Sequence, residues 1–380
     1  MSEPKPLLSG RARWLVPVLL LVLLVVSVHR YQVAVTTLRV ELGGEALGTT
    51  WSVKLAGELA PERQRSLQAA LENALARVDA QMSTWRDDSE LSRFNLLGAD
   101  APFVFSPEAF AVFAISEEVA VRSGGAFDVT VGPLVDAWGF GARPRRATAP
   151  EAEQLASLRR DVGRHWLRLD AVERSVEKRR AGVRVDLSAV AKGYAVDLLA
   201  QTVSERGHAN FLVEIGGELR GAGERPGGGP WRVAIEEPRE EGRQVHRIVA
   251  LSDAAMATSG DYRNFFTDDA GRRFSHTIDP RTGSPIAHPL ASVTVVHPSA
   301  AWADAWATAL NVLGPEAGYA RAESEGLAAY FLVREQDPEP GLGSDPGSAD
   351  AHPTDGAFEA RWTPAFEPLL LPDPRSGDDS

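Results

Sequence analysis

Residues 301–314 have the sequence AWADAWATALNVLG. Apolar side chains recur there at helical spacing, and Gly314 follows the last of them, so the pattern predicts a helix over Ala300–Leu313. Asp304 and Thr308 lie one turn apart and project from the same face of that helix. A converging carboxylate and hydroxyl are hard oxygen ligands of the kind that Mg²⁺ accepts. A helix charge and a threonine bonded back to its own helix explain the same two residues without a metal.

The segments around this helix predict an α+β fold. Periodicity and capping signals predict three more helices, over residues 61–82, from Ser106 to the glycines at 124 and 125, and over Ser188–Arg206. Short β-branched runs predict strands at Phe211–Ile215, Trp231–Ile235, Ile248–Leu251 and Val293–His297. Because these elements show no regular βαβ alternation, the pattern favours an α+β fold over a doubly wound sheet.

Two stretches predict loops. Gly221–Pro230 is rich in glycine and predicts a hairpin connection. Glu335–Pro353 is rich in Pro, Gly, Asp and Ser, and predicts a disordered insertion in a late hairpin. The strands of that hairpin are expected at Ala328–Val333 and Ala357–Trp362. We therefore expect residues 31–380 to form one large domain that carries the insertion at 335–353.

The composition excludes several functional classes. The charged fraction of 24% and the hydrophobic fraction of 44% are typical of a globular protein. A net charge of −12 repels a polyanion and argues against nucleic-acid binding. With no cysteine, the chain has no disulfide, zinc-thiolate site, iron–sulfur cluster or thiol nucleophile. The eight histidines lack zinc-site spacing, and no G-x-S-x-G, Walker A or G-x-G-x-x-G motif is present.

Residues 1–30 predict a signal anchor or a signal peptide. Trp14–Val28 is a nearly continuous apolar run of 15 residues that follows three basic residues. A spanning helix needs about 17–25 residues, so the run is short. No small-x-small cleavage site stands before Arg30, which favours an uncleaved anchor over a removed peptide. The basic flank predicts that residues 31–380 lie outside the cytoplasm, on the periplasmic side of the inner membrane.

A second polar cluster lies in VRVDLSAVAKGYAVD, residues 183–197. A strand-like start leads from Asp186 into a helix that carries Lys192, so a carboxylate could bind ligand hydroxyls and an ammonium could face phosphate. An ordinary helix cap and a solvated lysine explain the same residues. In a third cluster, SHTIDPRTG at 275–283, a tight loop explains the turn residues, and His276 fits either a structural or a catalytic role.

Taken together and in order, eight segments of the chain resemble the ApbE family, the FAD:protein FMN transferases. The resemblance covers residues 43–335 and 355–366. The segments are ALGTTWSV at 46–53, MSTWRDDSELSRFN at 82–95, GGAFDVTVGPLVDAWGFG at 124–141, VDLSAVAKGYAVD at 185–197, EIGGELRGAG at 214–223, ATSGDYRNF at 257–265, SHTIDPRTGSP at 275–285 and ADAWATAL at 303–310.

The resemblance implies a T-fold-like architecture with mixed sheets flanked by helices. It also implies an enzyme that uses Mg²⁺ and FAD, transfers FMN to a Thr or Ser hydroxyl of an acceptor protein, and releases AMP. The metal ligands it implies are Asp304, Thr308 and the backbone carbonyl of Ala189. The acceptor is expected to carry a flavinylation motif and to be a membrane electron-transfer subunit.

Position by position, the resemblance also implies the cofactor contacts and the catalytic residues. The FAD contacts it implies are Leu47, Trp85, Ala126, Phe127, Asp128, Asp186, Lys192 and Ile278. Asp304 would act through the metal, and His276 or a nearby carboxylate would accept the proton of the acceptor hydroxyl. Trp85 offers a face on which a ring system can stack, although core packing would explain it too. Leu47, Trp85 and Ser275 stand where methionine, tyrosine and histidine are usual in the family.

Two other functions fit the same sequence. One is a Mg²⁺-dependent FAD pyrophosphatase, in which water replaces the acceptor hydroxyl and the products are FMN and AMP. The other is a non-catalytic periplasmic flavin-binding protein. The pair Asp304 and Thr308 argues against a mere binder, since binding alone needs no metal on the pyrophosphate.

Overall fold

The computed structural model describes residues 23, 24, 27, 39–141, 149–239, 242–260, 265–267, 273–335 and 357–372. The segment expected at 1–30 and the insertion expected at 335–353 lie almost entirely outside these residues. Within the described ranges, no helix combines the length and the apolar character that crossing a membrane requires. The N-terminal anchor therefore stays a prediction.

The main sheet has eight strands in the order β1-β2-β6-β7-β10-β15-β16-β17. All neighbouring pairs are antiparallel, which corrects the expectation of mixed sheets. The physical reason is partly local, since the tight β1–β2 and β6–β7 hairpins can join only antiparallel strands. The strand bounds are β1 Arg39–Ala46, β2 Thr49–Ala56, β6 Phe211–Ile215, β7 Glu218–Ala222, β10 Ala254–Gly260, β15 Leu290–His297, β16 Ala328–Arg334 and β17 Phe358–Trp362.

The four predicted helices are confirmed. They are α2 (Pro61–Met82), α4 (Pro107–Arg122), α7 (Ser188–Glu205) and α8 (Ala300–Ser324). The predicted end at Gly314 is instead a kink with φ of 80°, after which α8 continues to Ser324. Shorter helices are α3 (Glu90–Leu96), α5 (Gly132–Ala137) and α6 (Ala152–Leu158), with 3₁₀ turns η1 (Arg159–Asp161), η2 (Arg164–Trp166) and η3 (Glu367–Leu369).

Two predictions about strand pairing have opposite outcomes. The strand expected at Ala357–Trp362 pairs with β16 as predicted. The hairpin predicted across Gly221–Pro230 is wrong, because β7 pairs with β6 and β10 whereas β8 pairs with β9, so this loop joins two sheets.

The smaller sheets complete the fold. Their strands are β3 Phe103–Val104, β4 Leu167–Asp170, β5 Ser175–Lys178, β8 Trp231–Glu236, β9 Val245–Leu251, β11 Phe265–Thr267, β12 Arg273–Ser275, β13 Ile278–Asp279 and β14 Ser284–Pro285.

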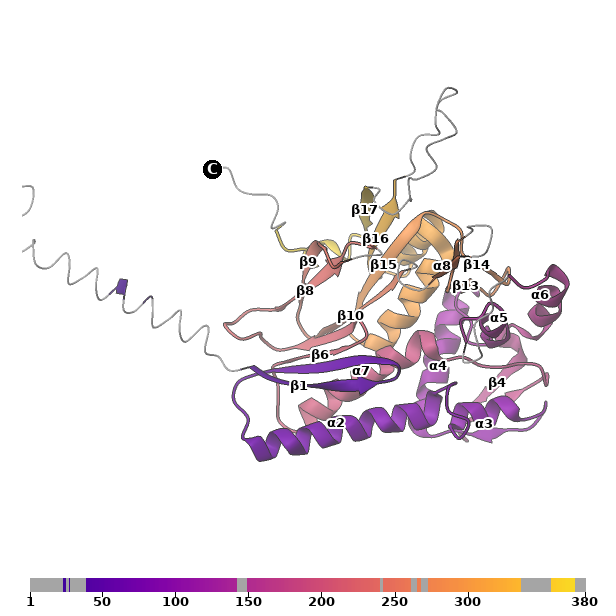
Figure 1. The fold of residues 1–380 in the computed structure, drawn as a ribbon, viewed down its shortest axis with the longest axis horizontal. Coiled ribbons are helices and arrows are strands. Elements are labelled where there is room, and N and C mark those ends of the chain that lie inside the picture. Colours follow the sequence, from indigo (N-terminus) through magenta and orange to yellow (C-terminus); the bar gives the residue numbers. More distant parts are fainter. Residues whose placement is uncertain are drawn as a thin grey trace, which may run out of the picture.

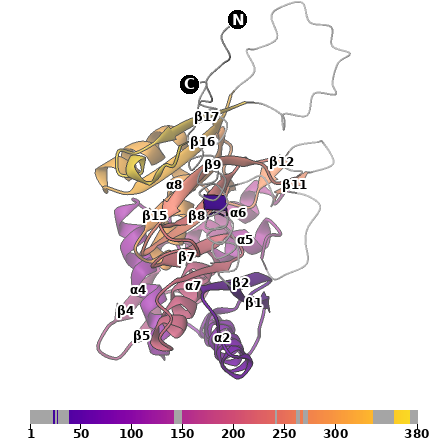
Figure 2. The same ribbon diagram turned by 90° about the vertical axis from the view of Figure 1, so that its left-hand side faces the viewer.

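The main sheet separates two hydrophobic cores. Helices α7 and α8 pack on one face, and the β8–β9 pair contacts β7 and β10 (Figures 1 and 2). Strand alternation assigns side chains to each core. In β10, Ala255 and Ala257 belong to the helix-side core whereas Met256 belongs to the other, and Phe331 and Tyr330 divide in the same way in β16. The sheet therefore supplies a rigid base for α7 and α8, which carry the predicted metal ligands.

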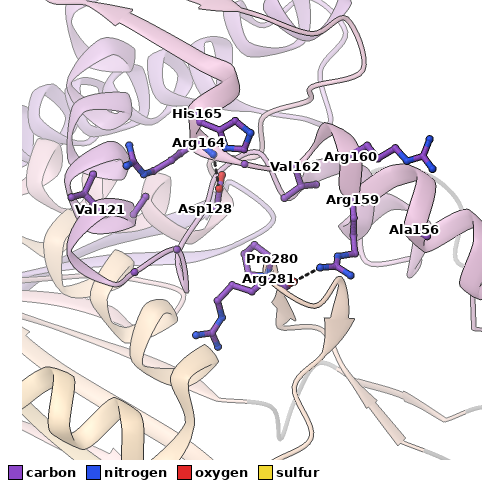
Figure 3. Close-up of a pocket in the computed structure, with 14 residues that line it drawn as sticks. Val121, Asp128, Ala156, Arg159, Arg160, Val162, Arg164, His165, Pro280 and Arg281 are labelled. Atoms are coloured by element: carbon purple, nitrogen blue, oxygen red, sulfur yellow. Dashed lines mark hydrogen bonds between the residues drawn. The ribbon is translucent and has the colours of Figure 1, made fainter.

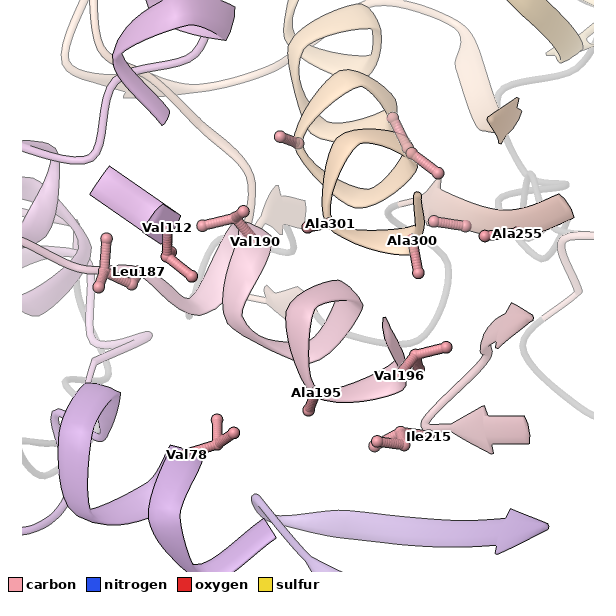
Figure 4. Close-up of a cluster of buried hydrophobic side chains, with 14 of the residues drawn as sticks. Val78, Val112, Leu187, Val190, Ala195, Val196, Ile215, Ala255, Ala300 and Ala301 are labelled. Carbon is pink, nitrogen blue, oxygen red and sulfur yellow. The ribbon is translucent and has the colours of Figure 1, made fainter. Parts of the chain in front are cut away.

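Helices α7 and α8 approach each other closely at Gly193. A Cβ added there would lie 2.3 Å from the carbonyl oxygen of Ala300 and 2.8 Å from the Cβ of Asp304. In Figure 4, Ala195 and Val196 of α7 lie among the buried side chains between α2 and α8. The missing side chain of Gly193 is therefore what allows Asp304 to sit against the backbone of α7.

Candidate active site

One cavity of about 1240 Å³ is lined by every residue that the sequence predicted for the site. The predicted residues come from segments far apart in the chain, which the fold brings together around this space. They are Leu47, Trp85, Ala126, Phe127, Asp128, Asp186, Ala189, Lys192, His276, Ile278, Asp304 and Thr308. Lining the cavity does not by itself establish a role, so each side chain is considered by its surroundings.

Asp304 lies at the buried end of the cavity. The residue is only 4% exposed, and its Oδ2 accepts a hydrogen bond of 3.0 Å from the backbone N–H of Gly193. No described group donates to its Oδ1. Burial raises the pKa of Asp304, against the opposing effects of the Lys192 charge and the Gly193 N–H. A cation at Oδ1 would offset the cost of this buried carboxylate.

Lys192 forms an ion pair with Glu218, a residue that the sequence did not predict for the site. Its Nζ lies 2.5 Å from Glu218 Oε1, whereas the buried Oε2 has no hydrogen-bond partner within the described residues. Burial raises the pKa of Glu218 to about 7, although the Lys192 charge opposes this. Burial lowers the pKa of Lys192, but the charges of Glu218 and Asp304 raise it by more. Lys192 therefore stays charged between two carboxylates.

The donor set at this end of the cavity fits a magnesium ion. Thr308 on α8 and Ala189 in the first turn of α7 line the cavity with Asp304, and the Thr308 hydroxyl lies 3.3 Å from that of Ser259. In the part of the chain that is described, no cluster of three or more His, Asp or Glu side chains could hold a metal. One carboxylate, a hydroxyl and a carbonyl suit Mg²⁺, which commonly takes its remaining ligands from phosphates and water. We call Asp304, Thr308, Lys192 and Glu218 the floor of the cavity.

Asp197 fixes the N-terminus of α8, and with it the floor. Its carboxylate accepts hydrogen bonds from the backbone N–H groups of Ala300 and Ala301, at 3.0 and 3.1 Å, and from the hydroxyl of Ser299 at 2.6 Å. Arg220 completes the arrangement through an ion pair with the same carboxylate. A negative charge at a helix N-terminus is favourable, so Asp197 on α7 locks the two helices together. Its place at the end of the VDLSAVAKGYAVD segment was the signal that the sequence offered.

Trp85 and Leu47 also line the cavity, and they differ from the floor. Trp85 follows α2 and is 73% exposed, so core packing does not explain it. Leu47 and Gly48 form the turn between β1 and β2 with φ of 52° and 75°. This left-handed conformation is unfavourable for leucine, and such strain is tolerated where the surrounding structure requires it. We call Leu47 and Trp85 the rim of the cavity.

Comparison with known protein families identifies the group to which the chain belongs. The model described as "ApbE family" matches residues 47–331, well over half of the sequence. The chain belongs to the ApbE family. The resemblance that the eight sequence segments suggested is therefore confirmed.

Curated and solved ApbE relatives cover most of the chain. The FAD:protein FMN transferase of Vibrio cholerae is 41% identical over 299 residues, which are 79% of this chain and 89% of the relative. The Escherichia coli K12 protein of the same name is 38% identical over 78% of this chain and 84% of the relative. The structure of the flavin transferase ApbE from V. cholerae has a TM-score of 0.76 at 37% identity, covering 88% of this chain and 99% of that one. The apo flavinyl transferase ApbE of Pseudomonas stutzeri has a TM-score of 0.74 at 38% identity, covering 88% and 97%.

Two carboxylates predicted as ApbE cofactor contacts also organise the backbone. Asp186 accepts hydrogen bonds from the N–H and the hydroxyl of Ser188, which close a local turn. It is not the helix cap that the sequence also allowed, because the N-cap residue of α7 is Leu187. Asp128 is buried, with Oδ1 bonded to the N–H and hydroxyl of Thr130 and Oδ2 bonded to the N–H of Arg164 at 2.7 Å. Both side chains therefore shape the wall of the cavity, whatever they contribute to a ligand.

His276 is the proton-acceptor candidate that the loop geometry favours. It is half-buried, lines the cavity and lies edge-on to Phe140 at 6.3 Å between ring centroids. The nearby carboxylate of Asp279 is engaged by the guanidinium of Arg281 through two hydrogen bonds of 2.9 Å. The tight turn expected here is confirmed, since Gly283 N–H bonds to the carbonyl of Asp279 at 2.8 Å. Asp279 is thus a turn residue, and Asp261 lies outside the described residues.

Proposed function

We propose that this protein is a Mg²⁺-dependent FAD:protein FMN transferase. It takes FAD as substrate, transfers FMN to a Thr or Ser hydroxyl of an acceptor protein, and releases AMP. The observation that carries the proposal is one cavity whose walls contain both an oxygen donor set on α7 and α8 and an exposed tryptophan. The V. cholerae and E. coli relatives, which share 41% and 38% identity with it, are named for the same transfer.

The two parts of the cavity suit the two parts of FAD. Trp85 on the rim offers an open aromatic face to a ring system. On the floor, Asp304, Thr308 and the Ala189 carbonyl would hold Mg²⁺, which would supply charge neutralisation on the pyrophosphate. Lys192 places an ammonium group beside the same region, held there by Glu218.

The transfer exchanges one P–O bond for another. The acceptor oxygen forms a bond to the phosphorus of the FMN half, and the bond from that phosphorus to the bridging oxygen breaks. AMP leaves with the bridging oxygen, and FMN is joined to the acceptor as a phosphoester. His276, which lines the cavity, takes the hydroxyl proton as the new bond forms.

The partner and the location belong to the same proposal. An acceptor with a flavinylation motif would be a subunit of a membrane electron-transfer complex, and the apolar run at Trp14–Val28 would hold the enzyme at the periplasmic face of the inner membrane. Fractionation of cells that express the full chain tests the location. Recovery in the soluble cytoplasmic fraction would contradict it.

Mass spectrometry of an acceptor tests the activity. The full chain is incubated with FAD, Mg²⁺ and a candidate acceptor protein, and AMP is measured by chromatography. A mass increase on the acceptor equal to one FMN phosphoester, with matching AMP, is the expected result. AMP and free FMN without a modified acceptor would support the pyrophosphatase instead. Tight FAD binding without AMP release would support the non-catalytic flavin binder.

A further inference from the structure

A second hollow, of about 660 Å³, lies beside the cavity. The two spaces share Asp128 and Pro280 in their walls. Figure 3 shows the carboxylate of Asp128 next to the backbone of Arg164, and the side chain of Arg159 directed at the backbone of Arg281. Most of the charged side chains that line the hollow are arginines. They are Arg159, Arg160, Arg164 and Arg281.

Two of these arginines are neutralised by neighbouring acids. Arg164 contacts Glu117 at 2.5 Å, and Arg281 forms its two-point pair with Asp279. The one lining carboxylate, Asp128, has its oxygens occupied by hydrogen bonds from Thr130 and Arg164. These groups give the hollow its shape and add little uncompensated charge.

Arg159 and Arg160 are different. Both are exposed, and no described carboxylate forms an ion pair with either of them. The guanidinium of Arg159 donates to the carbonyl oxygen of Arg281 at 2.5 Å, and its side chain packs so closely that a Cβ on Gly283 would lie 2.6 Å from it. Arg159 is thus held in place by a neutral acceptor and keeps its positive charge available. In a chain of net charge −12, this is a local site where an anionic group would be favoured.

We propose that this basic hollow binds acidic side chains of the acceptor protein, beside the hydroxyl that receives FMN. The proposal rests on the transferase function proposed above. A guanidinium binds a carboxylate through two parallel hydrogen bonds, which gives orientation as well as attraction. The acceptor is the reactant that is a polypeptide, and an extended chain advances about 3.3–3.6 Å per residue. A short segment can therefore reach both neighbouring spaces at once.

Peptide binding to charge-reversed variants tests the hollow. The full-length enzyme is compared with the double variant Arg159→Glu/Arg160→Glu. The probes are two short synthetic peptides that each contain a single threonine, flanked by aspartates in one and by lysines at the same positions in the other. Fluorescence anisotropy gives both dissociation constants without any need for catalysis. The double variant should shift the ratio of the two constants by about tenfold towards the lysine peptide.

A matched variant separates local from overall charge. Arg63→Glu/Arg65→Glu changes two exposed arginines on α2 and alters the net charge equally, so it should leave the peptide ratio near that of the wild type. An equal shift in both double variants would overturn the proposal. So would an unchanged ratio in the Arg159/Arg160 variant. Binding of inorganic phosphate that is lost in this variant, with no peptide discrimination, would identify a small-anion site instead and overturn it too.

Different results would contradict the transferase function and the assignment of the hollow. If the wild type prefers the aspartate peptide but transfers no FMN to any acceptor, the transferase function is wrong. If FMN is transferred and the Arg159→Glu/Arg160→Glu variant keeps the acidic preference, the function holds and the assignment of the hollow is wrong. The variant should keep the wild-type KM for FAD, because the hollow lies outside the cavity in which FAD is expected to bind.

Discussion

The floor and the rim of the cavity are built in opposite ways. On the floor, Asp304 and Glu218 are each 4% exposed, and α7 and α8 pack so closely at Gly193 that a Cβ would have no room there. On the rim, Trp85 is 73% exposed and Leu47 occupies a strained turn. A change on the floor therefore risks both chemistry and folding, whereas a change at the exposed Trp85 should act on the ligand alone. Substitutions that separate these effects test the contrast.

Asp304→Asn should have the largest effect on activity. The amide keeps the shape of the side chain and an oxygen to accept the Gly193 N–H, but it loses the charge that would hold the metal. Loss of one such electrostatic group typically costs about 10²–10³ in kcat. AMP release should fall by at least that factor, while FAD affinity, measured by flavin fluorescence, changes much less. Unchanged turnover would contradict the metal assignment.

Gly193→Ala should have the largest effect on stability. The added Cβ would lie 2.3 Å from the Ala300 carbonyl oxygen, which belongs to packed backbone that cannot move cheaply. Overpacking of this kind costs about 1–3 kcal/mol, which exceeds the gain of about 1 kcal/mol from helix propensity. Urea unfolding should show a lower free energy of unfolding. Gly98→Ala is the control, since nothing lies within 4 Å of a Cβ there, and an equal loss in both variants would contradict the argument.

The sequence predicted the floor better than its surroundings. Apolar periodicity located α7 and α8 and therefore placed Asp304, Thr308 and Lys192 correctly on helices. It missed β1, because the alternation in RVELGGEA covers only its first four residues before two glycines interrupt it, and this edge strand also depends on backbone pairing with β2. It also missed Glu218, whose partner Lys192 lies 26 residues earlier on another element.

Turn composition predicted the loop at 221–230 but not the strand pairing around it. Glycines at 221–230 signal a change of direction, but they do not specify which strands pair on either side of it. The pairing is set by long-range packing, as when Trp231 and Val249 join the core on the far side of the main sheet. Arg159 and Arg160 gave no signal as a site, because their shared hollow is formed only when Pro280 and Arg281 pack beside them.

Glu218→Gln should change how stability depends on pH. The folded-state pKa of Glu218 is about 7, above its ordinary value of 4.5. A raised carboxyl pKa means that its contribution to stability is present below pH 4.5 and is lost as the pH rises through 7. Between pH 5 and pH 8, the wild type should lose up to about 3 kcal/mol relative to the variant.

Urea unfolding in EDTA, without FAD, measures this difference. Lys192 stays protonated across the range, because its pKa is raised, so its own titration adds nothing to the difference. The pH-dependent part of the difference therefore reports on Glu218. Parallel stability curves for the two proteins would show that Glu218 titrates normally and that the floor is more hydrated than its burial indicates.

Trp85→Ala should have the smallest effect and should act on the ligand alone. Stacking on an aromatic ring contributes about 0.5–1.5 kcal/mol, so the Kd for FAD should rise about threefold to tenfold. Because the side chain is 73% exposed, the free energy of unfolding should stay within about 0.5 kcal/mol of the wild type. Trp85→Tyr keeps an aromatic face and should retain most of the affinity. A Kd that does not change in the alanine variant would remove Trp85 from the FAD site, whereas a large loss of stability would mean that the rim, like the floor, supports the fold.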